Sequence, residues 1–220
     1  LGIPAEPLLP ILALTESHSG RQSNGTTSES ANEARFGFKE RLEMILLEDT
    51  RNQIGKHDIK HEWFDQNGIE IRRTKLYVGD YTLPTNQSIC IDTKQSIQEL
   101  VADMQTDHVR FRNELLRAKE SGIALYILVE NDFQWISQKK NIFNTPVTCI
   151  KDLYRWENPR AFIFKSGKQA YPNCAKGSWL AKCCTTCEEK YGCRFVFCKP
   201  EESAEMIIKI LQGGGSDGKA

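Results

Sequence analysis

Two stretches of alternating apolar and polar residues, Ile69–Val78 and Ile89–Lys94, stand out in the first half of the chain. Alternation is typical of β-strands, because successive side chains of a strand point to opposite faces. In the second stretch it places Asp92 and Lys94 side by side on one face. The loop-forming residues 84–88 between the two stretches predict that they pair as a β-hairpin.

Continuous apolar runs and helical stripes surround this hairpin. Met44–Leu47 and Ala124–Val129 are unbroken apolar runs, which are typical of buried strands, and Arg194–Cys198 is a further short strand candidate. Helical spacing of apolar residues, with start and stop signals such as Pro200 and Gly192, predicts several helices. These cover Ile54–Asn67, Ser96–Met104, Asp107–Ser121, Ser178–Tyr191 and Pro200–Leu211. Strands that alternate with helices predict an α/β fold with a mixed sheet.

The 220 residues are expected to form one large domain with flexible ends. Residues 1–34 mix Pro, Ser, Thr, Gly and Asn without periodicity and are predicted to be a disordered or linker arm. The predicted domain covers residues 35–212, with a core at 44–131 and a C-terminal extension at 150–212. Residues 213–220 are predicted to be a flexible tail.

Charge and cysteine content limit the function classes. The chain has no net charge, but residues 1–34 carry one base and four acids, so the remainder has a net charge of +3. This weakly basic remainder permits a nucleic-acid partner without requiring one. Leu8–Leu14 is short and interrupted by Pro10, which predicts neither a signal peptide nor a membrane span. Eight cysteines without a secretory signal predict free thiols and a cytoplasmic or DNA-associated, intracellular protein.

Asp80, Asp92 and Lys94 form the candidate chemical site. The predicted hairpin brings the two carboxylates together, and such oxygen ligands suit Mg²⁺ or Mn²⁺. A neighbouring lysine can hold an attacking water or neutralise charge that develops on a phosphate. Many Asp–Lys pairs on strands are only solvated cross-strand charges. The spacing alone therefore leaves both interpretations open.

A longer constellation favours the catalytic interpretation. The chain reads Leu47-Glu48-Asp49-Thr50-Arg51, then Val78-Gly79-Asp80-Tyr81, then Asp92-Thr93-Lys94, then Arg110 before an apolar strand that ends in Glu130. In order and spacing, residues 44–131 resemble the XPF (xeroderma pigmentosum group F) type nuclease domain of the PD-(D/E)XK superfamily. The resemblance implies a restriction-endonuclease-like mixed β-sheet flanked by helices, and metal-dependent hydrolysis of DNA.

The resemblance also implies roles for the acids and the lysine. Asp80 and Asp92 would bind Mg²⁺ or Mn²⁺ together with the main-chain carbonyl of Thr93. Asp49 would be a third carboxylate, bound to the metal directly or through water. Lys94 would position the attacking water or stabilise the developing charge.

The basic residues Arg51, Arg110 and Arg112 are expected to contact the DNA backbone or to buttress the acids. The resemblance implies an endonuclease that cuts branched or flapped DNA during repair or recombination. DNA is thus the expected partner, the resemblance is compatible with a homodimer, and nothing in the sequence points to a membrane.

Three positions depart from the family pattern. The family's Glu-Arg-Lys reads Asp92-Thr93-Lys94, its Glu after Asp-x-Arg is Asn52, and the Asp expected four residues after the lysine is Gln98. These changes keep the metal core and weaken the assignment of a substrate, and no paired helix-hairpin-helix module is evident. The alternative function is therefore a catalytically degenerate domain that binds DNA or serves as the partner subunit of a nuclease.

Several further residues have structural interpretations. Glu48, Glu62 and Glu130 are interpreted as solvated surface acids. Cys184 and Cys187 have the CxxC spacing of a zinc site, but they fall in a predicted helix, which favours free thiols packed under that helix. The aromatic residues that could stack on unpaired bases, with core packing as the preferred interpretation, are Trp135, Tyr154 and Trp156.

Overall fold

The computed structural model describes residues 44–53, 55, 57–131, 135–137, 142–144 and 146–214. The predicted arm at 1–34 and residues 215–220 of the predicted tail lie outside the described residues. Among the helices of the described ranges, none is long and apolar enough to cross a membrane.

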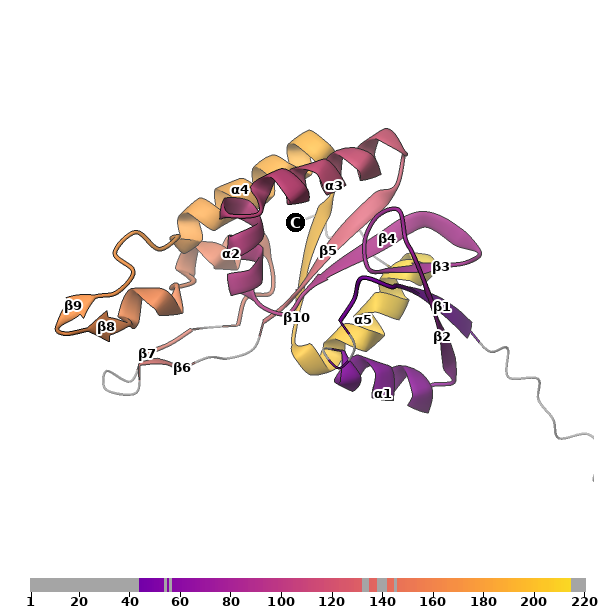
Figure 1. The fold of residues 1–220 in the computed structure, drawn as a ribbon, viewed down its shortest axis with the longest axis horizontal. Coiled ribbons are helices and arrows are strands. Elements are labelled where there is room, and N and C mark those ends of the chain that lie inside the picture. Colours follow the sequence, from indigo (N-terminus) through magenta and orange to yellow (C-terminus); the bar gives the residue numbers. More distant parts are fainter. Residues whose placement is uncertain are drawn as a thin grey trace, which may run out of the picture. The chain divides into compact units, whose positions relative to one another are not determined.

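A six-stranded mixed sheet forms the centre of the domain (Figure 1). In chain order its strands are β1 (Met44–Asp49), β2 (Ile69–Thr74), β3 (Tyr81–Leu83), β4 (Asn86–Lys94), β5 (Ala124–Glu130) and β10 (Arg194–Cys198). Across the sheet the order is β10-β5-β4-β3-β1-β2. Strands β10, β5 and β4 are parallel, β3 is antiparallel to both β4 and β1, and β2 is parallel to β1. The predicted α/β fold with a mixed sheet flanked by helices is confirmed.

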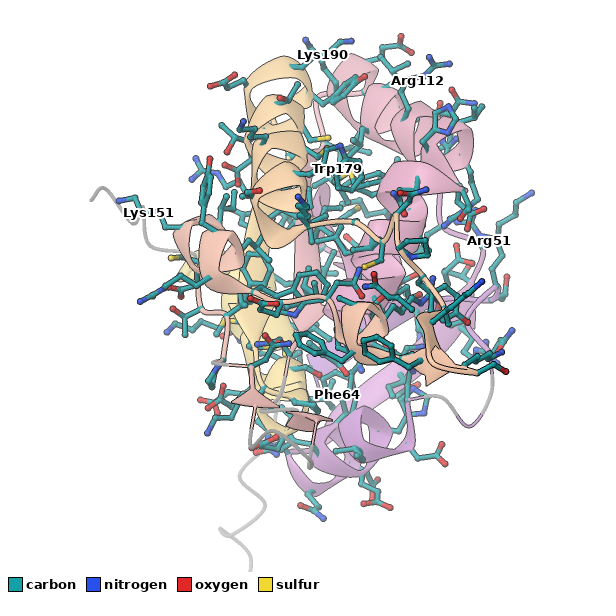
Figure 2. The ribbon with its side chains drawn as sticks, turned by 90° about the vertical axis from the view of Figure 1, so that its left-hand side faces the viewer. Arg51, Phe64, Arg112, Lys151, Trp179 and Lys190 are labelled. Atoms are coloured by element: carbon teal, nitrogen blue, oxygen red, sulfur yellow. The ribbon has the colours of Figure 1, made fainter. Side chains whose placement is uncertain are left out.

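Helices pack on both faces of this sheet (Figure 1). One face is covered by α2 (Ile97–Gln105), α3 (His108–Glu120) and α4 (Gly177–Tyr191), and the other by α1 (Asp58–Gln66) and α5 (Ser203–Lys209). Each face has its own apolar core, and Phe64 of α1 is fully buried in the second (Figure 2). Because the strands of the sheet alternate between these two cores, neighbouring residues of one strand enter different environments.

Local signals explain where the helices begin and end. The hydroxyl of Ser96 accepts a hydrogen bond from the amide of Glu99 and thereby caps the start of α2. Helix α4 ends at Gly192 in the left-handed conformation. Both ends lie where the sequence predicted them, within one residue.

The hairpin differs from its prediction. The strand that starts at Ile69 ends at Thr74 and pairs with β1, not with β4. The alternation resumes beyond the end of the strand in Lys75–Val78, where Leu76 and Val78 are buried and Lys75 and Tyr77 are exposed. The partner of β4 is instead β3, with Tyr81 opposite Ile91. The expectation that Asp80 comes close to Asp92 still holds, because Asp80 immediately precedes β3.

An extension separates β5 from α4. It contains two short strand pairs and two 3₁₀ helices (Figure 1). The strands are β6 (Trp135–Ser137), β7 (Ile142–Phe143), β8 (Phe164–Lys165) and β9 (Lys168–Gln169), and the 3₁₀ helices are Ile150–Arg155 and Pro159–Phe162. A further 3₁₀ turn, Pro200–Glu202, leads into α5.

Candidate active site

Asp80 is held at the start of β3 by the neighbouring strand. Its amide donates to the carbonyl oxygen of Ile91 at 2.6 Å, and its Oδ2 accepts hydrogen bonds from the amide and the hydroxyl of Thr93 at 2.8 and 2.7 Å. The preceding Gly79 has a φ of +72°, and a Cβ there would lie 2.8 Å from the Ile91 carbonyl oxygen. Only glycine therefore allows the chain to approach β4 this closely.

Lys94 is clamped between two buried carboxylates. Its Nζ lies 2.6 Å from Oδ2 of Asp92 and 2.8 Å from Oδ2 of Asp103. The short distance between Lys94 and Asp92 confirms that these two side chains share one face of β4. On the other side of Asp103, the exposed Arg110 of α3 reaches Oδ1 at 2.6 Å.

Glu114 of α3 adds a fourth carboxylate. It is buried, and its Oε1 accepts a hydrogen bond from the amide of Gly79 at 3.1 Å. Four acids, from the start of β3 and from β4, α2 and α3, thus converge on the region of one lysine. We call this group the acidic cluster; its members are Asp80, Asp92, Lys94, Asp103 and Glu114.

The acidic cluster contains more carboxyl groups than bases to pair with them. Burial raises the pKa of Asp92 well above its usual value, and the charges of Asp80 and Glu114 raise it further, against the opposing effect of Lys94. Burial also raises the pKa of Asp80, although the hydrogen bonds from Thr93 partly counteract it. Buried acids with raised pKa values in a cleft or edge position are candidates for function.

Burial has the opposite effect on the pKa of Lys94 from its effect on the acids. Burial alone would lower the pKa of its ammonium group, but the carboxylates of Asp92 and Asp103 outweigh that effect and raise the pKa. Lys94 is therefore protonated throughout the physiological pH range. A permanently charged ammonium can donate hydrogen bonds and neutralise negative charge, whereas it cannot accept a proton.

Asp49 at the end of β1 is bound by protein donors on both oxygens. Oδ1 accepts from the amide and Nε of Arg51 at 2.6 and 2.8 Å, and Oδ2 accepts from Nη2 of Arg51 and the amide of Leu76 at 2.8 and 2.9 Å. Burial by itself would raise the pKa of Asp49, but these hydrogen bonds lower it below its usual value. Because the four lone-pair positions of the carboxylate are in use, the geometry makes Asp49 an anchor for Arg51.

Asp49 is also tied to the acidic cluster through the main chain. Its amide donates to the carbonyl oxygen of Asp80 at 2.8 Å. The charges of Asp80 and Glu114 help to raise the pKa of Arg51, after its hydrogen bonds to Asp49. Arg51 and Arg112 are both exposed and lie toward the same side of the view in Figure 2.

The residues present fit a divalent metal ion with few protein ligands. The carboxylates of Asp80 and Asp92 adjoin the main chain of Thr93, and surplus negative charge favours a cation. Within the described ranges, no three side chains of the His, Cys, Asp and Glu types could hold a metal ion together. A Mg²⁺ ion here would take two carboxylates and keep several waters, which is its usual habit in proteins.

A second polar group lies on the opposite face of the sheet. Glu48 accepts a hydrogen bond from the hydroxyl of Tyr81 at 3.1 Å and lies 3.1 Å from His61 and 3.3 Å from Arg73. Nearby, Lys60 and Glu130 form a buried ion pair. We call this group the paired cluster; its members are Glu48, Lys60, His61, Arg73, Tyr81 and Glu130.

The paired cluster corrects an expectation. Glu48 and Glu130 are only 1% and 6% exposed, so they are not solvated surface acids. Each is buried because the fold supplies a base that lies far from it in the sequence. The third acid of that expectation, Glu62, is exposed as predicted.

Two members of the acidic cluster were missed by sequence reasoning. Asp103 and Glu114 lie on the buried faces of α2 and α3, three residues after the core residues Leu100 and Phe111. An acid at helical spacing within an apolar stripe is a usable signal, since buried charges are rare unless they are paired. Gln98 stands at the position of the family's downstream Asp. The acid of the same helix that contacts Lys94 is instead Asp103.

The remaining candidates differ in their surroundings. The eight cysteines, all within the described ranges, form no disulfide in the structure, and Cys184 is buried in α4. Trp156 packs into the core, whereas Tyr154 is exposed. The side chain of Trp135 lies outside the described residues.

Known proteins resemble this chain in sequence pattern and in structure. The family model of the ERCC4 domain matches residues 48–210. Among solved structures, XPF from Aeropyrum pernix matches with 16% identity and a TM-score of 0.48, covering 78% of this chain and 66% of that one. XPF from Aeropyrum pernix in complex with DNA matches with 15% identity and a TM-score of 0.49, covering 80% of this chain and 69% of that one. No curated protein sequence matches the chain.

Proposed function

Because the chain belongs to the ERCC4 domain family, we propose that it is a metal-dependent endonuclease that hydrolyses phosphodiester bonds in branched or flapped DNA. The observation that carries the proposal is the acidic cluster. Three buried acids and the partly exposed Asp80 lie near a single buried lysine, which pairs with two of them, and a stable core does not need this surplus of acids. A site that binds a cation and a phosphate does need it.

The metal would be held by Asp80, Asp92 and the main-chain carbonyl of Thr93. When bound, a Mg²⁺ or Mn²⁺ ion supplies Lewis acidity toward the phosphate and toward a water molecule. Oδ2 of Asp80 already accepts two hydrogen bonds from Thr93, which fixes the orientation of the carboxylate and leaves Oδ1 available. Pre-oriented ligands reduce the cost of binding the ion.

Lys94 contributes as a fixed positive charge. Since it stays protonated, it orients the attacking water or stabilises negative charge on the phosphate, and it does not remove a proton. Asp103 positions this ammonium from the far side, and Arg110 in turn holds Asp103. Asp103 and Arg110 are therefore positioning residues for Lys94.

The DNA backbone would be contacted by exposed guanidinium groups. Arg51 is oriented by Asp49, and Arg110 and Arg112 lie on the exposed side of α3. Contacts between arginines and phosphates fix the position of the DNA without reading its sequence. Asp49 takes part by holding Arg51, because a metal bound directly to Asp49 would have to displace one of its four donors.

The test is a cleavage panel with flap, fork, Holliday junction and plain duplex DNA, in Mg²⁺, Mn²⁺ or a chelator. We expect cleavage of a branched or flapped substrate with metal and none with the chelator. Asp80→Ala and Asp92→Ala are expected to abolish cleavage and to keep DNA binding. If the wild-type protein binds these DNAs but cuts none of them with either metal, the endonuclease proposal is wrong, and the catalytically degenerate DNA-binding subunit takes its place.

A further inference from the structure

The extension between β5 and α4 has an uneven charge. Residues 158–187, which run from the extension into the first turns of α4, contain five bases and no acid, in a chain whose net charge is zero. The bases are Arg160, Lys165, Lys168, Lys176 and Lys182. A local excess of this size attracts a polyanion. None of the residues assigned to the acidic cluster lies in this segment, so the charge calls for a separate explanation.

Two of these lysines face each other across the β8–β9 hairpin. Lys165 lies opposite Lys168, and the two-residue loop between them has a φ of +47° at Ser166 and +76° at Gly167. Positive φ values at both positions define a tight turn that holds the two strands rigidly. Like charges directly opposite each other destabilise a hairpin. None of the ion pairs among the described residues involves either lysine, so an external anion would relieve the repulsion.

Aromatic side chains accompany the bases. Phe164 is 60% exposed and Tyr171 is 41% exposed, both too high for core residues of this size. The register places Phe164 opposite Gln169, hence on the face of the hairpin away from Lys165 and Lys168. The guanidinium of Arg160 lies 5.5 Å from the centroid of the Tyr171 ring. On the hairpin itself, Phe164 lies on one face and the two lysines lie on the other.

A cavity adjoins Arg160 and Tyr171. It has a volume of about 320 Å³, and Gln105 of α2, Arg160, Tyr171 and Asn173 contribute to its lining. An aromatic ring, a guanidinium and two side-chain amides are the groups that proteins use to stack on and hydrogen-bond with an unpaired base. The cavity is therefore suited to a nucleobase.

The base of the hairpin is fixed to the helix that follows Lys94. Oδ1 of Asn158 accepts hydrogen bonds from Nε2 of Gln98 at 2.7 Å and from the amide of Arg160 at 3.0 Å. Its Nδ2 donates to the carbonyl oxygen of Ala175 at 2.9 Å. Gln98, where the family pattern has an acid, thus connects the extension to α2, and Figure 1 shows β8 and β9 beyond that helix.

We propose that the β8–β9 hairpin, together with Arg160 and Tyr171, binds the unpaired nucleotides of the DNA substrate. Phe164 and Tyr171 stack on bases, and Lys165 and Lys168 contact phosphates. This inference rests on the proposed function, because it names the part of the DNA that selects the substrate. It gives the extension the substrate-recognition role that a helix-hairpin-helix module would otherwise supply.

The first test compares binding of two DNAs in a chelator, which prevents cleavage: a duplex with a single-stranded arm, and a blunt duplex of equal length. Phe164→Ala is expected to weaken binding of the armed DNA by about 5- to 150-fold, the range for loss of one stacked base. Binding of the blunt duplex is expected to change little. Phe164→Trp is expected to restore affinity, and Ile59→Ala, which truncates an exposed apolar residue of α1, is the matched control.

The second test concerns the lysine pair. The double variant Lys165→Gln, Lys168→Gln is expected to reduce the salt dependence of DNA binding by about one unit of slope per lost phosphate contact. It is also expected to melt no lower than the wild type, because the repulsion between the lysines is gone. Lys209→Gln, at an exposed lysine of α5, is the control for the loss of one positive charge outside the hairpin, and each single variant, Lys165→Gln or Lys168→Gln, is compared with it.

The outcomes separate this inference from the proposed function. Wild-type protein that binds armed DNA through Phe164 but cuts no DNA contradicts only the proposed function. Wild-type protein that cuts DNA while Phe164→Ala binds armed DNA at full affinity overturns the hairpin inference. Equal weakening for armed and blunt DNA overturns the assignment to unpaired nucleotides.

Discussion

Each face of the sheet carries a group of charged side chains, and the two groups differ in whether their acids have basic partners. In the paired cluster, Glu48 and Glu130 each have a basic partner, supplied by Arg73 and Lys60. In the acidic cluster, the buried Lys94 pairs with Asp92 and Asp103. The exposed Arg110 pairs with Asp103 again, and within the described part of the chain no ion pair involves Asp80 or Glu114. Neighbouring residues of β1, Glu48 and Asp49, point to opposite faces and so belong to the two different environments.

The difference separates structure from function. A buried ion pair with both partners present is close to neutral for stability, and it is costly to break. A buried surplus of like charges costs stability as long as nothing neutralises it. Because marginal stability leaves little room for such a cost, the acidic cluster is the face where we expect ligand chemistry, and the paired cluster is the face where we expect folding energetics.

The largest expected effect is on cleavage. Asp92→Asn is expected to reduce the rate by about 10³-fold or more, because it removes several kcal/mol of charge stabilisation at the metal. Its stability is expected to equal or exceed that of the wild type, since ionised Asp92 has a raised pKa in the folded protein and thus destabilises it above its unfolded pKa. Cleavage assays and urea unfolding of the same preparation measure both quantities.

The matched variant on the opposite face is Glu48→Gln. It removes the charge shared by His61 and Arg73, and we expect it to lower the free energy of unfolding by about 1–3 kcal/mol. Cleavage per folded molecule is expected to stay near the wild-type rate. If Asp92→Asn lost stability and Glu48→Gln lost activity, the division between the two clusters would be wrong.

Breaking the buried ion pair of the paired cluster is expected to lower stability more than Glu48→Gln does. Lys60→Met leaves Glu130 as an unpaired charge in a buried position, which we expect to lower the free energy of unfolding by about 3–5 kcal/mol. The double variant Lys60→Met, Glu130→Leu is expected to recover most of that loss, because it removes both charges and keeps apolar volume. Urea unfolding of the four proteins of this double-mutant cycle gives the coupling energy directly. Additive losses would show that the pair contributes through packing, not through charge.

The main elements of the fold were predictable because their apolar residues follow one period. Helices α2 and α3 and strand β5 lie within one residue of their predicted bounds. The pairing of the hairpin could not be predicted, because apolar and polar residues keep alternating beyond Thr74, where strand β2 ends. The short β3 depends on Gly79, whose approach to Ile91 is a contact between segments and leaves no periodic trace.

The candidate site was predictable only in part, for a related reason. The adjacency of Asp92 and Lys94 follows from the strand period alone, so the sequence contained it. Asp103 and Glu114 reach the same point from two helices, and that convergence depends on how α2 and α3 pack. The burial of Glu48 depends in the same way on bases from other elements, so its neighbours in the sequence suggested a surface residue.

The smallest expected effect is a pH dependence on the side of the paired cluster. Burial and the positive charge of Lys60 lower the pKa of His57 below its usual value, so the folded protein holds this imidazole neutral. As the pH falls below about 6.5, the unfolded chain binds a proton before the folded protein does, and stability is lost over that range. His57→Phe keeps a ring beside Tyr81 and is expected to lose less stability between neutral and mildly acidic pH than the wild type. Urea unfolding at several pH values measures the difference, with His108→Gln, an exposed position at the start of α3, as the control. An identical pH dependence for wild type and His57→Phe would mean that the charge balance of this face does not depend on a neutral His57.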